Sequence, residues 1–124
     1  MANGTIAFDT LSTSGQISGA AVSVDTDYLA YGSAKMWAGM DLSITVLDSF
    51  NVSSVRDDAA GRTTFFINND MANAGYSLTG MEGQGEANTC MSQSPTTSSF
   101  QFNVYSGSAY VDRDFGVNVT GDLA

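Results

Sequence analysis

The 124-residue chain contains no histidine, one cysteine, one proline and only four lysine or arginine residues. Without histidine it lacks the side chain best suited to proton transfer near neutral pH, which excludes Ser-His-Asp and Cys-His nucleophile systems. The single Cys90 cannot form an internal disulfide or a cysteine-based zinc site, so stability must come from packing. We therefore expect a protein that is not an enzyme and that uses no metal or other cofactor.

Positive charge is scarce, because the four basic residues accompany 13 acidic ones and the net charge is -9. Such a charge repels phosphate backbones and anionic membrane surfaces. No segment approaches the roughly 20 consecutive apolar residues that a membrane helix needs. We expect neither nucleic acid nor a membrane as a partner. The opening MANGTIAFDT lacks the positive and continuous apolar regions of a secretory signal, so we expect synthesis in a cytoplasm.

The dominant pattern in the chain is an alternation of apolar and polar residues, which is typical of half-buried strands. In DLSITVLDSFNV the apolar residues occupy every second position from Leu42 to Val52 except Asp48, near which we expect the strand to break. The alternation returns in Phe65 and Ile67, Tyr76 and Leu78, Phe100, Phe102 and Val104, and Phe115, Val117 and Val119. From these segments we expect six residues to face the core: Phe65, Ile67, Phe100, Phe102, Val117 and Val119.

The stretch NVSSVRDDAAGRTTFFINN predicts a hairpin. Its strands run from Val52 to Asp57 and from Arg62 to Asn68, and DDAAG forms the turn. Gly61 suits a left-handed backbone position, and we expect Asp57 and Asp58 to hydrogen-bond to their own turn.

Many short strands between turn signals indicate an all-β fold, an antiparallel β-sandwich of about six to eight strands. We assign this domain to residues 35–124. Residues 1–34 are rich in Gly, Ser, Thr and Ala, with weak strand character at Ile17, Val22 and Val24. They predict an extended arm that docks on a partner or joins subunits together.

One cluster of aromatic and charged residues surrounds the SGSA turn. It consists of Tyr105, Tyr110, Asp112, Arg113 and Asp114. These side chains could bind a polar ligand, or they could be cross-strand pairs on an exposed sheet face. The sequence leaves both readings open.

Two other features favour structural roles. The acidic pairs lack the spacing of a calcium loop, so solvated turns are the better interpretation. Trp37, next to Met36 and Met40, could stack on a sugar ring, but we expect it to pack at a core edge. A glycan depolymerase using Asp112 and Asp114 is disfavoured, because glycoside hydrolysis needs two carboxylates flanking one cleft.

Three segments, GSAKMW, DSFNVSSVRDDAAGRTTFFINNDMANAGYSLTG and SPTTSSFQFNVYSGSAYVDRDFGVNVTG, resemble a small module of tail-fibre and other virion-surface proteins of tailed bacteriophages. The resemblance covers residues 33 to 121. It rests on Lys35 to Trp37, Ser49 to Asp57, Gly61, Thr63 to Asn68, Met71 to Tyr76, Thr96 to Phe102 and Asp112 to Val119. Arg62 and Asp70 depart from the module's pattern without altering its order of strands.

The resemblance implies a structural component of a virion, made in the cytoplasm of a host bacterium: a capsid decoration or cement protein, a head fibre or a tail-fibre subunit. The strand plan is also similar to the sandwich of H-type lectins and of trimeric tail-fibre tip domains. The alternative function is therefore an adhesion module that binds a host glycan.

We expect the partners to be other virion proteins and further copies of the chain, most simply in a homotrimer. Exposed strand edges need covering, and this chain has few basic residues and one proline to protect them. Four apolar residues out of phase with the main face suggest a second buried surface: Leu47, Val55, Phe66 and Tyr105.

Overall fold

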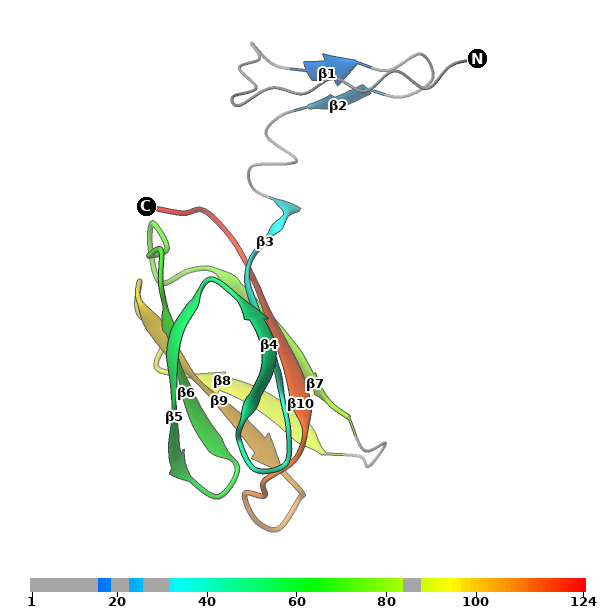
Figure 1. The fold of residues 1–124 in the computed structure, drawn as a ribbon, viewed down its shortest axis with the longest axis vertical. Coiled ribbons are helices and arrows are strands. Elements are labelled where there is room, and N and C mark those ends of the chain that lie inside the picture. Colours follow the sequence, from blue (N-terminus) through cyan, green and yellow to red (C-terminus); the bar gives the residue numbers. More distant parts are fainter. Residues whose placement is uncertain (1–15, 19–22, 26–31, 84–87) are drawn as a thin grey trace.

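The structure, a computed structural model, describes residues 16–18, 23–25, 32–83 and 88–124. Within these ranges the chain forms two four-stranded antiparallel sheets and a two-stranded one (Figure 1). The strands are β1 (Gln16–Ser18), β2 (Ser23–Asp25), β3 (Ala34–Met40), β4 (Val46–Phe50), β5 (Val52–Ala59), β6 (Arg62–Ile67), β7 (Ser77–Glu82), β8 (Thr89–Gln93), β9 (Ser99–Tyr105) and β10 (Phe115–Thr120). The orders β4-β3-β10-β7 and β5-β6-β9-β8 confirm the all-β sandwich.

The two-stranded sheet lies within the expected arm. Ile17 of β1 is opposite Val24 of β2 in an antiparallel pair. Most of the rest of residues 1–34 lies outside the described residues, and so does Val22. The docking role of the arm stays a prediction.

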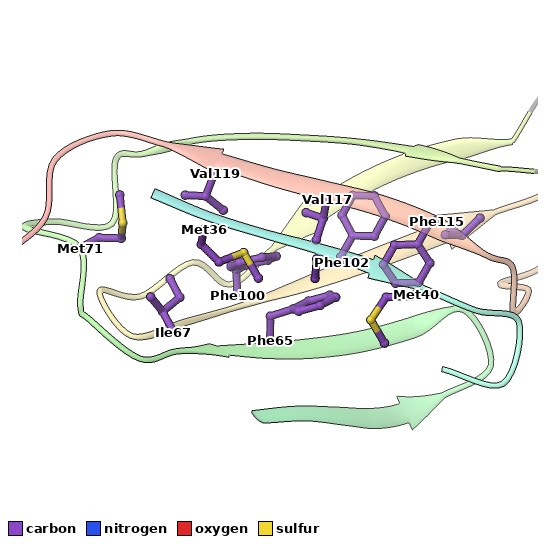
Figure 2. Packing of buried hydrophobic residues seen from close by; sticks show 12 residues of the cluster. Met36, Met40, Phe65, Ile67, Met71, Phe100, Phe102, Phe115, Val117 and Val119 are labelled. Atoms are coloured by element: carbon purple, nitrogen blue, oxygen red, sulfur yellow. The ribbon is translucent and has the colours of Figure 1, made fainter. Parts of the chain in front are cut away.

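Alternation along the strands builds the core between the two four-stranded sheets (Figure 2). The six residues expected to face inward are all buried, which confirms the register. Phe65 stacks on Phe100 with ring centres 5.3 Å apart, and Phe102 stacks on Phe115 at 4.9 Å. The structure adds six further buried apolar residues: Met36, Ala38, Met40, Met71, Val104 and Phe115.

The long alternating run from Leu42 to Val52 is not one strand broken near Asp48. It begins with a turn in which the Asp41 carboxylate accepts hydrogen bonds from the N–H groups of Ser43 and Thr45, at 2.9 and 2.8 Å. Ile44 has a φ of 59° in this turn, so the strand starts only at Val46. The expectation was wrong because a local aspartate turn overrides the apolar pattern.

The run is broken instead at Asn51, which also has a φ of 59° and moves the chain from one sheet to the other. Its amide nitrogen donates hydrogen bonds to the carbonyl oxygens of Lys35 (2.8 Å) and Asn69 (3.2 Å). Its side-chain oxygen accepts the N–H of Asn69 at 2.7 Å. One residue thus links the start of β3 to the end of β6, across the sandwich.

The hairpin of β5 and β6 has the expected strands with a shorter turn. Ala59 pairs with Arg62, so Ala60 and Gly61 alone connect them. Gly61 has the predicted left-handed backbone, with a φ of 63°. The prediction that Asp57 and Asp58 belong to the turn was wrong, because β5 extends through Ala59. Asp57 pairs with Thr63 in the hairpin, and the Asp58 side chain bonds to residues on the outer face of the sheet.

The four residues out of phase do not share one surface. Val55 pairs with the buried Phe65 and packs against the core, whereas Leu47 is 69% exposed on the edge strand β4. Phe66 and Tyr105 lie on β6 and β9, in the same sheet as Val55, but their side chains are on the side opposite the core.

Replacing Met36 with alanine tests the core assignment. The side chain is fully buried, so we expect a loss of about 2–5 kcal/mol in the free energy of unfolding. Met91 is 38% exposed, and its replacement with alanine should cost less than about 0.5 kcal/mol. Urea denaturation followed by circular dichroism measures both, and equal losses would contradict the register of β3.

Candidate functional site

The structure divides the predicted site residues into two groups. Tyr105 and Tyr110 form an isolated β-bridge, and their rings meet edge to face with centres 5.2 Å apart. The Arg62 guanidinium lies 4.0 Å from the centre of the Tyr110 ring, within the range of a cation-π contact. The two tyrosines therefore belong to a packed cluster beside the start of β6.

Asp112 holds this cluster onto the β5-β6 turn. Its carboxylate accepts the N–H of Gly61 at 2.6 Å, while the Gly61 carbonyl accepts the N–H of Val104 at 2.9 Å. A Cβ at Gly61 would lie only 2.6 Å from the Val104 carbonyl oxygen, so close packing as well as φ requires glycine here. The Asp112 carboxylate thus accepts a hydrogen bond that stabilises the fold.

Arg113 and Asp114 face a different neighbour, the end of β7. Arg113 Nε lies 3.9 Å from Oε2 of the buried Glu82, which also accepts a hydrogen bond from Asn88 at 3.2 Å. The Asp114 carbonyl accepts the N–H of Gly83 at 2.8 Å. Asp112 and Asp114 therefore bind different parts of the chain.

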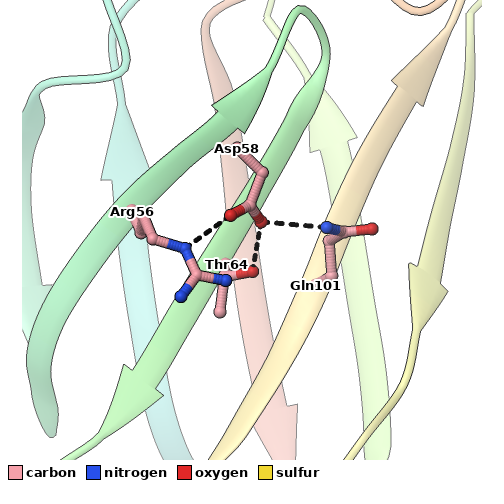
Figure 3. A network of polar contacts seen from close by, with 4 residues as sticks. All are labelled: Arg56, Asp58, Thr64 and Gln101. Carbon is pink, nitrogen blue, oxygen red and sulfur yellow. Dashed lines mark hydrogen bonds and ion pairs between the residues drawn. The ribbon is translucent and has the colours of Figure 1, made fainter.

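A second polar cluster, which the sequence interpretation missed, is centred on Asp58 (Figure 3). The carboxylate accepts hydrogen bonds from Thr64 Oγ1 and Arg56 Nε, both at 2.5 Å, and from Gln101 Nε2 at 2.9 Å. These donors come from three adjacent strands, β5, β6 and β9. The bond from Thr64, followed by those from Arg56 and Gln101, lowers the pKa of Asp58 from 3.8 to about 2.

A shallow hollow adjoins this network on the outer face of the sheet. It has a volume of about 320 Å³. The lining residues are Arg56, Thr64, Phe66, Ser94, Thr96, Ser99, Phe100 and Gln101. The Arg56 guanidinium lies 5.6 Å from the centre of the Phe66 ring. An aromatic ring surrounded by hydroxyl, amide and guanidinium groups is suited to binding a polar ligand with an apolar face.

Trp37 lies on the outer face of the other sheet, with Phe50 and Asp48 on the neighbouring strand β4 and Asn118 on β10. Trp37 is 38% exposed, so the expected position at a core edge is wrong. Met36, Ala38 and Met40 point inward, and the side-chain period of two places Trp37 outward. The alternation in AKMWAGM was the signal that could have shown this.

No protein-family model, curated protein or solved structure matches this chain. Across the described residues, no group of three or more Cys, Asp or Glu side chains could hold a metal ion. The same part of the chain has no helix long and apolar enough to cross a membrane.

Acid unfolding tests the Asp58 network. Because the pKa of Asp58 is lower in the folded chain than in the unfolded one, its stabilisation is present above about pH 4 and lost as the pH falls towards 2. The site is near the surface and screened, so we expect a loss of about 1 kcal/mol.

Replacing Asp58 with asparagine should remove this part of the pH dependence, as measured by urea denaturation at pH 6, 4 and 2.5. Asp57→Asn removes the same charge one residue earlier and should keep the wild-type profile. Parallel profiles for Asp58→Asn and the wild type would contradict the network.

Proposed function

We propose that this chain is a structural component of a bacteriophage virion: a small surface protein of the capsid decoration, head-fibre or tail-fibre kind. Its partners are other virion proteins and copies of itself, most simply in a trimer, and it reaches the virion from the cytoplasm of its host bacterium. The chain acts by binding and assembly and catalyses no reaction.

The observation that carries the proposal is the exposure of large apolar side chains on one sheet. Trp37, Phe50 and Met81 are between 38% and 77% exposed, and the strand pairings place them on the same outer face of the sheet. Exposed apolar groups gathered on one side are typical of a protein that works in an assembly.

The resemblance to virion-surface modules agrees with the local structure. Its segment SFNVSSVRDD contains Asn51, the corner between the sheets, and its glycine is Gly61, the left-handed turn residue. Both positions have exacting backbone requirements, so the shared residues support a shared arrangement of strands.

Localisation tests the proposal. Particles of the phage that encodes the chain should contain it, seen by mass spectrometry of purified virions and by immunogold electron microscopy. A variant lacking residues 1–30 should keep the sheet signal of the sandwich in circular dichroism, because the strands of the two four-stranded sheets begin at Ala34. It should be absent from the particles, because the expected docking arm is removed. The chain's absence from virions, despite abundance in the lysate, would contradict the proposal.

A second function, binding of a host glycan, is favoured by the hollow at Phe66. Sugar rings stack their apolar faces on aromatic side chains, and Gln101, Thr96 and Ser99 supply hydrogen-bonding groups beside this ring. The hollow is a better candidate than the cluster from Tyr105 to Asp114, where Asp112 is already bonded to the backbone of Gly61.

A bacterial glycan array separates these possibilities. If the hollow binds a glycan, Phe66→Ala should weaken binding at least about tenfold, through the lost ring contact. Tyr110→Ala should leave binding unchanged, and the opposite result would place the ligand at the tyrosine cluster. An array without any signal would leave the scaffold role alone.

A further inference from the structure

The outer face of the sheet β4-β3-β10-β7 contains a trough whose floor is made of glycine. Gly116 in the central strand β10 lies between Gly39 of β3 and Met81 of β7. In the next outward-facing row, Asn118 lies between Trp37 and Thr79. The trough has a volume of about 460 Å³, and these six residues line it with Ala38, Gly80 and Val117.

The chain's own fold does not require glycine at the floor. Among the described residues, a Cβ on Gly116 would have no atom within 4 Å, and one on Gly39 would meet only the Asp48 carbonyl oxygen at 4.0 Å. Neither glycine has a left-handed φ. Gly80 differs, because its Cβ would lie 2.5 Å from the Phe102 ring in the core.

Glycine inside a strand costs stability, about 0.5–1 kcal/mol relative to alanine. Two such residues side by side on a central part of the sheet, with open space above both, indicate that another molecule approaches the backbone there. Packing within the part of the chain that the structure describes gives no other reason for Gly39 and Gly116.

The residues around the trough indicate which kind of molecule approaches the backbone there. Met81 is 77% exposed directly beside Gly116, and Trp37 and Phe50 form an opposite pair between β3 and β4. None of the residues lining the trough is charged, although the chain as a whole carries -9. A second chain with the same net charge is repelled less at this uncharged lining than elsewhere, although Asp48 lies just beyond it, opposite Gly39 on the edge strand β4.

The face is also complementary to itself, because it holds a protruding apolar side chain beside an empty trough. We propose that copies of this chain associate through this face, with Met81 of one copy filling the glycine trough of the next. The contact is reciprocal in a dimer and runs head to tail in a ring such as the proposed trimer. Association through this face does not depend on the place of the protein on a virion.

Substitutions of Gly116, in the floor of the trough, and of Met81, the protruding side chain, test the proposal. Gly116→Val fills the trough with a side chain that favours strands. Met81→Ser removes the protruding apolar side chain at a position too exposed to affect folding. Met91→Ser is the matched control, a methionine on the opposite sheet and 38% exposed.

Light scattering over a hundredfold range of concentration should give the full chain a mass that is a multiple of 13.0 kDa. Gly116→Val and Met81→Ser should each weaken association at least tenfold, with the sheet signal in circular dichroism retained. Met91→Ser should associate as the wild type does.

Trp37 is the only tryptophan of the chain and lies in the trough, so its fluorescence reports on this face directly. Emission should shift to the blue as the wild type associates, and this shift should be absent in Gly116→Val. A wild type that stays at 13.0 kDa, or oligomers that both variants leave intact, would overturn the proposal. A monomer whose Trp37 emission responds to a soluble glycan would overturn it in favour of a sugar.

Discussion

The architecture depends on the corner at Asn51. Its left-handed backbone ends β4 and begins β5, so consecutive strands enter different sheets. Its side chain bonds to the backbone of Lys35, in β3 of one sheet, and of Asn69, just after β6 of the other. Asparagine tolerates the left-handed conformation and supplies both a donor and an acceptor, and few side chains meet both needs. Without the corner at Asn51, residues 46–59 would be expected to form one long strand.

The corner also determines which surfaces the chain presents. Once the sheets face each other, aromatic and methionine side chains fill the space between them, and each sheet keeps one outer face. The outer face of β5-β6-β9-β8 has a polar network in which Asp58 is satisfied by three donors. The outer face of β4-β3-β10-β7 has a trough lined by glycine, tryptophan and methionine, together with Thr79 and Asn118. One molecule therefore combines a face suited to water or a polar ligand with a face suited to another apolar surface.

Much of the core was predictable from local pattern, and the candidate sites were not. The inward positions of Phe65, Phe102 and Val117 follow from alternation, as does the turn at Gly61. Asp58 was misplaced because its partners Thr64 and Gln101 come from other strands, and Gln101 is 43 residues away. Trp37 was misplaced because its apolar character outweighed the alternation of its neighbours.

The sequence by itself determined the all-β class, the two-residue period and the inward register, because side chains alternate along a strand whatever lies beside it. Only the tertiary structure decided that β10 lies between β3 and β7, which places Gly116 next to both Gly39 and Met81. It also brought three donors to Asp58 and placed Asp112 against the Gly61 turn. These groupings depend on contacts between distant segments, and alternation within one strand carries no information about its neighbours.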